Sequence, residues 1–327
     1  MGKAIKTGHK NFTVSLQRLR LPPVWGSRFY VCARSSCLGG DKLGQMTLRE
    51  VLLKKTIALF GLMFGLSACG TTYVLPEIDD TSASRAKSMF AKAQSAPERE
   101  RVSRATAEQR FQRVARRVEP IAEKFCEAET ATLEGFNCDV VVGIDYKTQQ
   151  RNAYFTYDKE QPVIFMTLPI LQDMQSDDEV AFVMAHEYGH LIGRHIQKQK
   201  QQAMAGALIL GAITAYSNAQ AASAGVSYDP DAVGRNMELG AAAGSMVYSQ
   251  TYELESDTLG TRIAKASGYD PVKGAEYFAR PEDARTQAGN LSFWGTHPPD
   301  EKRIATVLAV NAQIEAQQGL QRKAKAQ

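Results

Sequence analysis

The chain has 327 residues and 44% of them are hydrophobic, enough for a sizeable core, so wholesale disorder is excluded. Its formal net charge of +4 is unevenly spread: residues 1–68 hold eleven Lys or Arg and two Asp or Glu, whereas the rest holds 28 basic and 33 acidic residues. A mildly acidic body lacks the positive field that binding to nucleic acid needs, so we expect no nucleic acid among the partners.

The first predicted element in chain order is a targeting signal at residues 46–68. Basic residues precede an apolar run from Ile57 to Leu66, which is too short to span a bilayer because spanning needs about 20 apolar residues. The run ends in "LSAC", which resembles a bacterial lipobox, where the signal is cut before the cysteine and the cysteine is lipidated. We therefore predict lipidation of Cys69; the alternative is a short buried helix with an incidental cysteine.

Met46 would give this signal an ordinary length at the start of a protein. Residues 1–45 show no helix or strand periodicity, and we expect them to be translated upstream sequence that is not native. The competing interpretation is an Arg-rich organellar transit peptide.

The segment after Cys69 is expected to carry one domain. Residues 69–100 are polar and rich in small residues, which predicts a lipid-anchored tether. A domain is expected over 101–315, followed by a polar tail over 316–327. Within the domain, apolar residues three and four apart predict an amphipathic helix around Phe111–Phe125, a β-branched run predicts a strand over 139–146, and two apolar runs around "DKEQ" predict a hairpin.

Cys126 and Cys138 bracket the expected junction between the amphipathic helix and the first strand. In an oxidising compartment an isolated pair of this kind favours a disulfide, with two separate buried thiols as the alternative.

The stretch "MAHEYGHLIGRH" holds three of the five histidines of the chain. A capping box of Ser176 and Glu179 begins a helix there, which is expected to run to about Lys198. Gly189 and Gly193 weaken this helix, which suggests close packing against a neighbour.

His186 and His190 are four residues apart and therefore project from one helix face, where two imidazoles can hold a zinc ion. Glu187 lies about 100° around the helix, beside the metal, where it can take a proton from a water that the metal activates. H-E-x-x-H is the zincin motif with this mechanism. His195 faces another direction and lacks the metzincin spacing, so we expect a packing or surface histidine there rather than a ligand.

The third zinc ligand is predicted to be Glu253 in "SQTYELESDTLG", because peptide-hydrolysing zinc sites use three protein ligands. Asp257 lies one turn further and is expected to orient a ligand histidine. Glu255 is the rival carboxylate, although it faces away from Asp257. An exposed acidic helix face is the alternative explanation of this stretch.

Taken together, "HEYGH", "ELESD", "GYDP" and "THPPDEKRI" resemble peptidase family M48, the gluzincins that include HtpX-like, Oma-like and BepA-type metalloproteases, over about residues 101–308. Among these, the chain resembles small bacterial periplasmic lipoproteins. The resemblance implies an α+β, zincin-like fold, mostly helical with a small mixed sheet. It implies one zinc ion (Zn2+) per chain on His186, His190 and Glu253, with Glu187 as general base and Asp257 as the second acidic position.

The resemblance also assigns two further sites. Asn152, Ala153 and Tyr154 match the edge strand that binds substrate. His297 matches a histidine near the zinc, which could be a regulatory fourth ligand or a donor to the oxyanion. Without the resemblance, it would be a histidine at the start of the C-terminal helix, which Pro298 and Pro299 open.

The expected function is a zinc metalloendopeptidase, lipid-anchored in the bacterial envelope, that hydrolyses misfolded or misassembled envelope proteins. The alternative is a non-catalytic or latent lipoprotein that acts as a chaperone or assembly factor. Expected partners are polypeptides, the membrane through the lipid on Cys69, and envelope assembly machinery. Gly70 after the lipidated cysteine indicates the periplasmic face of the outer membrane. Residues 203–248 are expected to form a small-residue hairpin that moves over the cleft, or else a segment that dips into the membrane.

Overall fold

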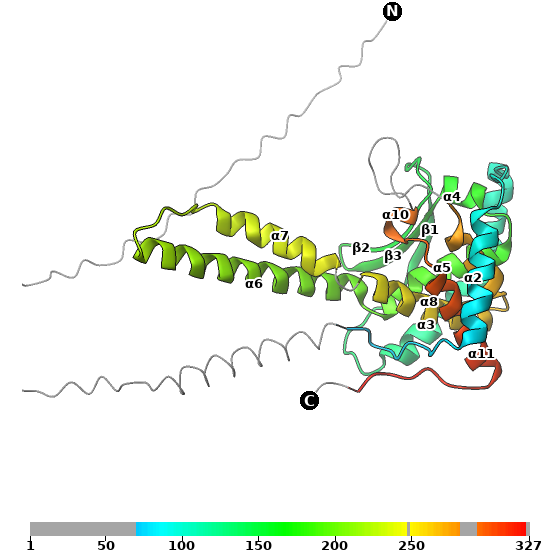
Figure 1. The fold of residues 1–327 in the computed structure, drawn as a ribbon. Coiled ribbons are helices and arrows are strands. Elements are labelled where there is room, and N and C mark those ends of the chain that lie inside the picture. Colours follow the sequence, from blue (N-terminus) through cyan, green and yellow to red (C-terminus); the bar gives the residue numbers. More distant parts are fainter. Residues whose placement is uncertain (1–69, 247–248, 282–292, 325–327) are drawn as a thin grey trace, which may run out of the picture. The chain divides into compact units, whose positions relative to one another are not determined.

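A computed structural model describes residues 70–246, 249–281 and 293–324 (Figure 1). The predicted upstream extension 1–45, the signal 46–68 and the lipidation site Cys69 lie outside these residues. The described part is mostly helical with one small mixed sheet, as the sequence predicts for the fold class.

The elements follow one another along the chain in this order: α2 (Asp80–Gln94), α3 (Arg104–Thr130), β1 (Val141–Asp145), β2 (Ala153–Asp158), β3 (Gln161–Thr167), α4 (Leu168–Asp173), α5 (Asp177–Ile192), α6 (His195–Ser223), α7 (Ala232–Met246), α8 (Ser249–Ala266), α9 (Pro271–Ala275), the 3-10 helix η2 (Glu276–Ala279), α10 (Phe293–Thr296) and α11 (Glu301–Glu315).

The sheet has the order β1-β3-β2, with β1 parallel and β2 antiparallel to β3, so β2 is an edge strand. The Asn152 carbonyl accepts from the Thr167 N–H at 2.9 Å. Because the backbone groups of successive residues point to opposite sides of a strand, those of Ala153 and Phe155 face the free edge. The predicted hairpin is confirmed, and one of its strands leaves backbone groups available.

Helix α5 runs through the hydrophobic core, and nearly all of its side chains are buried. It packs against α3 on one side and against α8 on another. A Cβ atom on Gly189 would lie 2.8 Å from the Ser256 Cα, and one on Gly260 would lie 3.0 Å from the His186 Cα. The glycines therefore let the α5 and α8 backbones touch, which brings the two predicted metal-binding segments together.

The predicted extension of α5 to Lys198 is wrong. The helix ends at Ile192 with Gly193 as its C-cap, and Arg194 adopts a left-handed conformation with φ 58° and ψ 38°. Glycine favours a helix end, and the left-handed residue after it redirects the chain. The new helix α6 begins at His195, whose ring folds back under Gly193.

The expected tether and tail are packed where the structure describes them. Tyr73 is fully buried in the main core cluster, and α2 packs against α11. The Val74 N–H donates to the Gln321 carbonyl and the Lys323 N–H donates to the Thr72 carbonyl, both at 2.9 Å. The segment that follows Cys69 is therefore paired with the segment that follows α11.

A disulfide joins Cys126, in the last turn of α3, to Cys138, just before β1, with 5.8 Å between their Cα atoms. It fixes the end of α3 to the start of the sheet.

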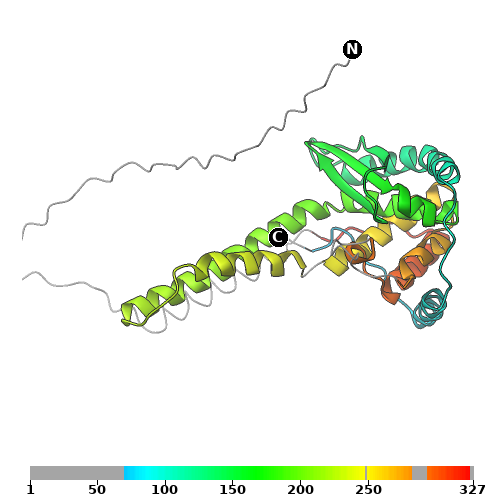
Figure 2. The ribbon, with the colours of Figure 1, turned by 90° about the horizontal axis from the view of Figure 1, so that it is seen from above.

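Helices α6 and α7 lie side by side and run in opposite directions (Figures 1 and 2). Their backbones touch, because a Cβ on Gly206 would lie 2.0 Å from the Gly240 carbonyl oxygen. Most of the exposed large hydrophobic side chains of the described residues lie on this pair and the segment that joins it: Met204, Leu208, Ile213, Tyr216, Val226, Tyr228, Met237 and Leu239. None of the described helices combines the length and apolar character needed to cross a membrane.

Candidate active site

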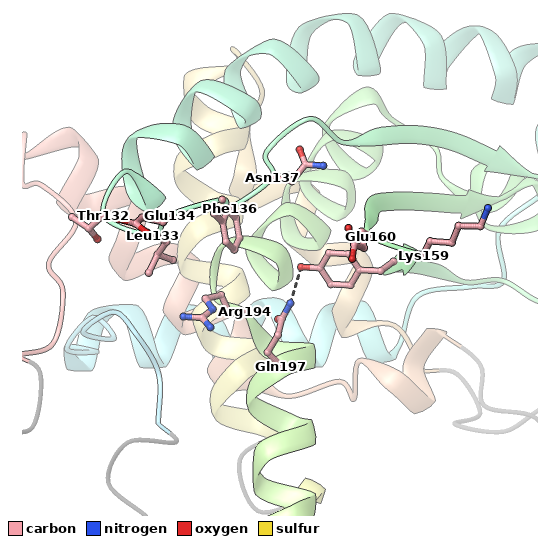
Figure 3. A pocket seen from close by; sticks show the side chains of 11 residues that line it. Thr132, Leu133, Glu134, Phe136, Asn137, Lys159, Glu160, Arg194 and Gln197 are labelled. Atoms are coloured by element: carbon pink, nitrogen blue, oxygen red, sulfur yellow. Dashed lines mark hydrogen bonds between the residues drawn. The ribbon is translucent and has the colours of Figure 1, made fainter.

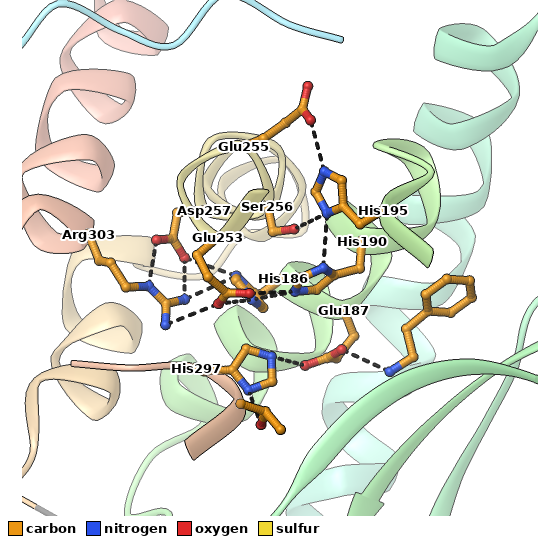
Figure 4. Close-up of polar contacts among 12 residues, drawn as sticks. His186, Glu187, His190, His195, Glu253, Glu255, Ser256, Asp257, His297 and Arg303 are labelled. Atoms are coloured by element: carbon orange, nitrogen blue, oxygen red, sulfur yellow. Dashed lines mark hydrogen bonds and ion pairs between the residues drawn. The ribbon is translucent and has the colours of Figure 1, made fainter. Parts of the chain in front are cut away.

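Four side chains from three parts of the chain meet beside α5 (Figure 4). His186 and His190 come from α5, Glu253 from α8, and His297 from the loop after α10. One ligand atom from each lies within 4.8 Å of all the others. The structure thus brings together all three predicted ligands, His186, His190 and Glu253, and places His297 beside them.

The spacing of these atoms fits a tetrahedral zinc ion. The Nε2 atoms of His186 and His190 are 3.0 Å apart; the first lies 3.4 Å from the Glu253 Oε2 and the second 3.4 Å from the Glu253 Oε1. Ligands at about 2.0–2.1 Å from a tetrahedral zinc lie about 3.3 Å from one another. The Glu253 Oε2 is also buried without a hydrogen bond, although the Arg303 Nη1 lies 3.4 Å from it, so this oxygen keeps lone pairs for a cation. The residues present therefore fit zinc.

The local electrostatics favour the metal-binding protonation state of Glu253 and His190, but not that of His186. Burial raises the pKa of the Glu253 carboxyl, but His297, His190 and Arg303 outweigh this and hold its pKa well below its ordinary value. Burial keeps the pKa of His190 well below its ordinary value. For His186, burial lowers the pKa, but contacts with Asp257 and Glu253 raise it to about 9. Zinc binding would therefore release a proton from His186.

Asp257, which the sequence analysis expects to orient a ligand histidine, lies beside His186. Its Oδ1 lies 2.9 Å from the His186 Nδ1. Burial raises the pKa of Asp257, but Arg303 and His186 lower it by more, so the net effect is a lowered pKa. Asp257 is therefore ionised and can only accept a hydrogen bond. The His186 Nδ1 therefore carries the proton, and its Nε2 is left to bind the metal.

Arg303, from α11, is a site residue that sequence analysis missed. Its Nε and Nη2 donate to the two oxygens of Asp257 at 2.8 and 2.7 Å, and its guanidinium carbon lies 3.8 Å from the centre of the Phe278 ring. The side chain is buried. It neutralises Asp257 and holds that carboxylate in the orientation in which its Oδ1 contacts the His186 Nδ1.

His195 is not a surface histidine. It is buried, and its Nδ1 lies 2.9 Å from the His190 Nδ1 while its Nε2 lies 2.8 Å from Glu255. It is outside the group of metal-ligand atoms. Because the chain turns at Arg194, the ring reaches back to His190, which a continuous helix would not allow.

Glu187 stands between the edge strand and the metal group. Its Oε2 accepts the Phe155 N–H at 2.9 Å, and its Oε1 lies 3.4 Å from the His297 Nε2 without a hydrogen-bond partner of its own. The predicted substrate residues Asn152, Ala153 and Tyr154 lie where β2 begins. Phe155, which sequence analysis did not select, makes the direct backbone link to Glu187.

A separate surface hollow of about 510 Å³ lies among the α3–β1 connection, the β2–β3 turn and the start of α6 (Figure 3). Gln197 donates there to the Tyr157 hydroxyl at 2.8 Å. None of the four metal-group residues lines this hollow.

Comparison with known proteins identifies the family. The model of peptidase family M48 matches residues 108–311, more than half of the chain. The beta-barrel assembly-enhancing protease of Escherichia coli is 28% identical over 137 residues, 40% of this chain and 26% of that protein. The mitochondrial metalloendopeptidase OMA1 of Arabidopsis thaliana is 27% identical over 191 residues, 58% of this chain and 35% of that protein. These alignments span about a quarter to a third of the two relatives. The residues that the family model matches include the whole metal group, and the chain belongs to peptidase family M48.

Proposed function

We propose that the protein is a zinc-dependent endopeptidase with Glu187 as its general base. The observation that carries the proposal is the meeting of His186, His190 and Glu253 at zinc-ligand spacing, with the unpartnered Glu187 Oε1 beside them. A scaffold without activity would not need all four groups, and the chain retains each of them. The alternative, a non-catalytic chaperone or assembly factor, is therefore less well supported.

The chain's own residues account for the steps around the metal. When bound, zinc polarises the peptide carbonyl and makes a water more acidic. Glu187 Oε1 is placed to take the proton of the attacking water and to pass it to the leaving amine. An extended substrate can pair with the outward backbone groups of Ala153 and with the Phe155 carbonyl, since the Phe155 N–H already donates to Glu187. The fixed edge strand would hold the scissile bond beside Glu187.

Unfolded or misassembled envelope proteins are the substrate class that we propose. An edge strand recognises backbone rather than a particular side chain, so it suits any extended polypeptide. The relatives named beta-barrel assembly-enhancing proteases support an envelope substrate and contact with assembly machinery.

Removal of the metal tests this function. A chelator should abolish the cleavage of casein by the purified protein, and one equivalent of zinc per chain should restore it. Cleavage that persists at full rate in zinc-free protein would refute the proposed mechanism.

The geometry at His297 favours the role of a latch. Its Nδ1 lies 3.2 Å from the Phe293 carbonyl oxygen and 2.9 Å from the Thr296 hydroxyl, which itself donates to that carbonyl, so both neighbours can accept a proton from Nδ1. With the proton on Nδ1, Nε2 keeps a lone pair for the metal group, whereas a donor to an oxyanion would need an N–H there. We propose that His297 takes the fourth ligand position and keeps the enzyme latent.

His297→Ala should therefore raise basal casein cleavage, by about tenfold if the latch contributes about 1.4 kcal/mol to the barrier. A strong loss of turnover at unchanged zinc affinity would instead assign the role of oxyanion donor. Unchanged cleavage and zinc affinity would leave His297 as the residue that begins the turn before α11.

We propose that Cys69 carries the lipid and that the protein faces the periplasm from the outer membrane. The exposed apolar side chains of α6 and α7 support an additional contact with the membrane surface. In density-gradient fractionation the protein should follow outer-membrane markers, and Cys69→Ala should release it into the soluble fraction. Migration with inner-membrane markers would contradict the location, and retention of Cys69→Ala in the pellet after alkaline carbonate would indicate insertion through α6 and α7.

A further inference from the structure

A buried chain of polar contacts leads away from His190 (Figure 4). The His195 Nδ1 lies 2.9 Å from the His190 Nδ1, and the His195 Nε2 lies 2.8 Å from the Glu255 Oε2. The second oxygen of Glu255 accepts the Tyr73 N–H at 2.7 Å. His195, Glu255 and Tyr73 are all buried. A backbone amide four residues after Cys69 is thus linked to a predicted zinc ligand.

The positions of the protons in this series of contacts follow from Glu255, the acceptor beyond His195. One oxygen of Glu255 accepts the Tyr73 N–H and the other lies 3.5 Å from the Lys198 Nζ, so Glu255 faces donors on both oxygens and is a carboxylate that only accepts. The His195 Nε2 must then carry a proton, which leaves the His195 Nδ1 as an acceptor. The His190 Nδ1 consequently donates to it, and the His190 Nε2 keeps the lone pair that faces His186 and Glu253.

Tyr73 is held firmly enough to place its N–H. The residues on either side of it pair with the segment after α11, through the 2.9 Å contacts of Thr72 with Lys323 and of Val74 with Gln321. The Arg322 Nη2 donates to the Tyr73 hydroxyl at 3.1 Å, and the Lys198 Nζ donates to the Thr72 Oγ1 at 2.8 Å. Lys198 Nζ also lies 3.5 Å from Glu255. The segment 70–74 is therefore built into the surroundings of the site.

We propose that Glu255 and His195 are positioning residues for His190, and that the segment 70–74 completes them through the Tyr73 N–H. The inference rests on the proposed zinc site and deepens it. Asp257 and Arg303 fix His186 from one side of the site, while Glu255 and His195 fix His190 from the other. The segment next to the lipidation site thereby affects zinc affinity, and breaking its contacts with Glu255 and with the segment after α11 would weaken the metal site.

The test is the zinc dissociation constant of the full chain, measured by competition with a chromophoric chelator. His195→Ala and Glu255→Ala should weaken zinc binding by about 10- to 100-fold, as loss of an outer partner of a ligand does. His195→Gln, whose amide can donate to Glu255 and accept from His190, should recover part of the affinity. The cobalt-substituted His195→Ala protein should also show altered visible absorption, because His190 is no longer held in one orientation.

The role of the anchor segment is isolated by two variants at one position. Tyr73→Ala loses the ring but keeps the N–H, whereas Tyr73→Pro loses both. Tyr73→Pro should bind zinc several-fold more weakly than Tyr73→Ala, although the two variants have the same circular dichroism spectrum and hence the same helix content. Equal affinities in these two variants would remove the segment from the proposal, and wild-type affinity in Glu255→Ala or His195→Ala would overturn it while leaving the proposed function intact. A wild-type chain that binds no zinc would overturn both.

Discussion

Glu187→Gln should abolish the cleavage of casein while the protein still binds one zinc ion per chain. The amide keeps the volume of the side chain and can still accept the Phe155 N–H, so the fold around α5 and β2 should persist. It cannot take a proton from water, and loss of a general base lowers turnover by about a hundred- to ten-thousand-fold. Initial rates together with elemental analysis of the same samples measure both parts of this result.

The matched control is Glu127→Gln, the same change at an exposed position on α3 away from the metal group. Its cleavage rate and zinc content should equal those of the wild type. Robust cleavage by Glu187→Gln would exclude Glu187 as the base, and loss of zinc in that variant would show that Glu187 acts on the metal site instead.

Arg303→Met should produce the largest loss of stability among single changes at the site. It leaves the buried Asp257 carboxylate without the two hydrogen bonds at 2.8 and 2.7 Å that neutralise it. Breaking a buried ion pair by removing one partner costs about 3–5 kcal/mol of unfolding free energy. His186 also loses its fixed acceptor, so zinc should bind about 10- to 100-fold more weakly. Urea unfolding of zinc-free protein separates the first effect from the second.

Lys302→Met, at the exposed neighbouring position of α11, is the control and should leave both quantities near wild-type values. The double change Arg303→Met with Asp257→Leu should be less destabilised than Arg303→Met alone, because it removes the uncompensated charge. An unfolding midpoint of Arg303→Met equal to that of the wild type would show that the pair contributes nothing to the folded state.

Residues that act through helical spacing could be predicted from the sequence. His186, Glu187 and His190 depend only on the geometry of one helix, and Glu253 and Asp257 on that of another. The expected hairpin, the disulfide partners and the amphipathic helix are likewise local patterns. Each of them lies in the structure where its own short segment indicated.

The remaining parts of the site depend on tertiary packing that local patterns do not contain. Arg303 lies in a run that reads as an exposed helix start, and only the packing of α11 on α8 buries it against Asp257. His195 was placed on a continued helix, whereas Gly193 and Arg194 turn the chain and direct the ring to His190. Tyr73 lies in a segment whose polar composition indicates a tether. Composition averages over the segment and does not reveal that this one ring is buried in the core.

Zinc content in ligand variants tests the central claim most directly. Elemental analysis of purified protein should find one zinc per chain in the wild type and in Glu187→Gln. It should find less than a tenth of that in His186→Ala and Glu253→Ala after dialysis against a weak chelator, because the ligands that remain hold zinc at least about tenfold less tightly. Full zinc occupancy in Glu253→Ala and His186→Ala, or a wild-type protein that takes up no zinc, would contradict the account.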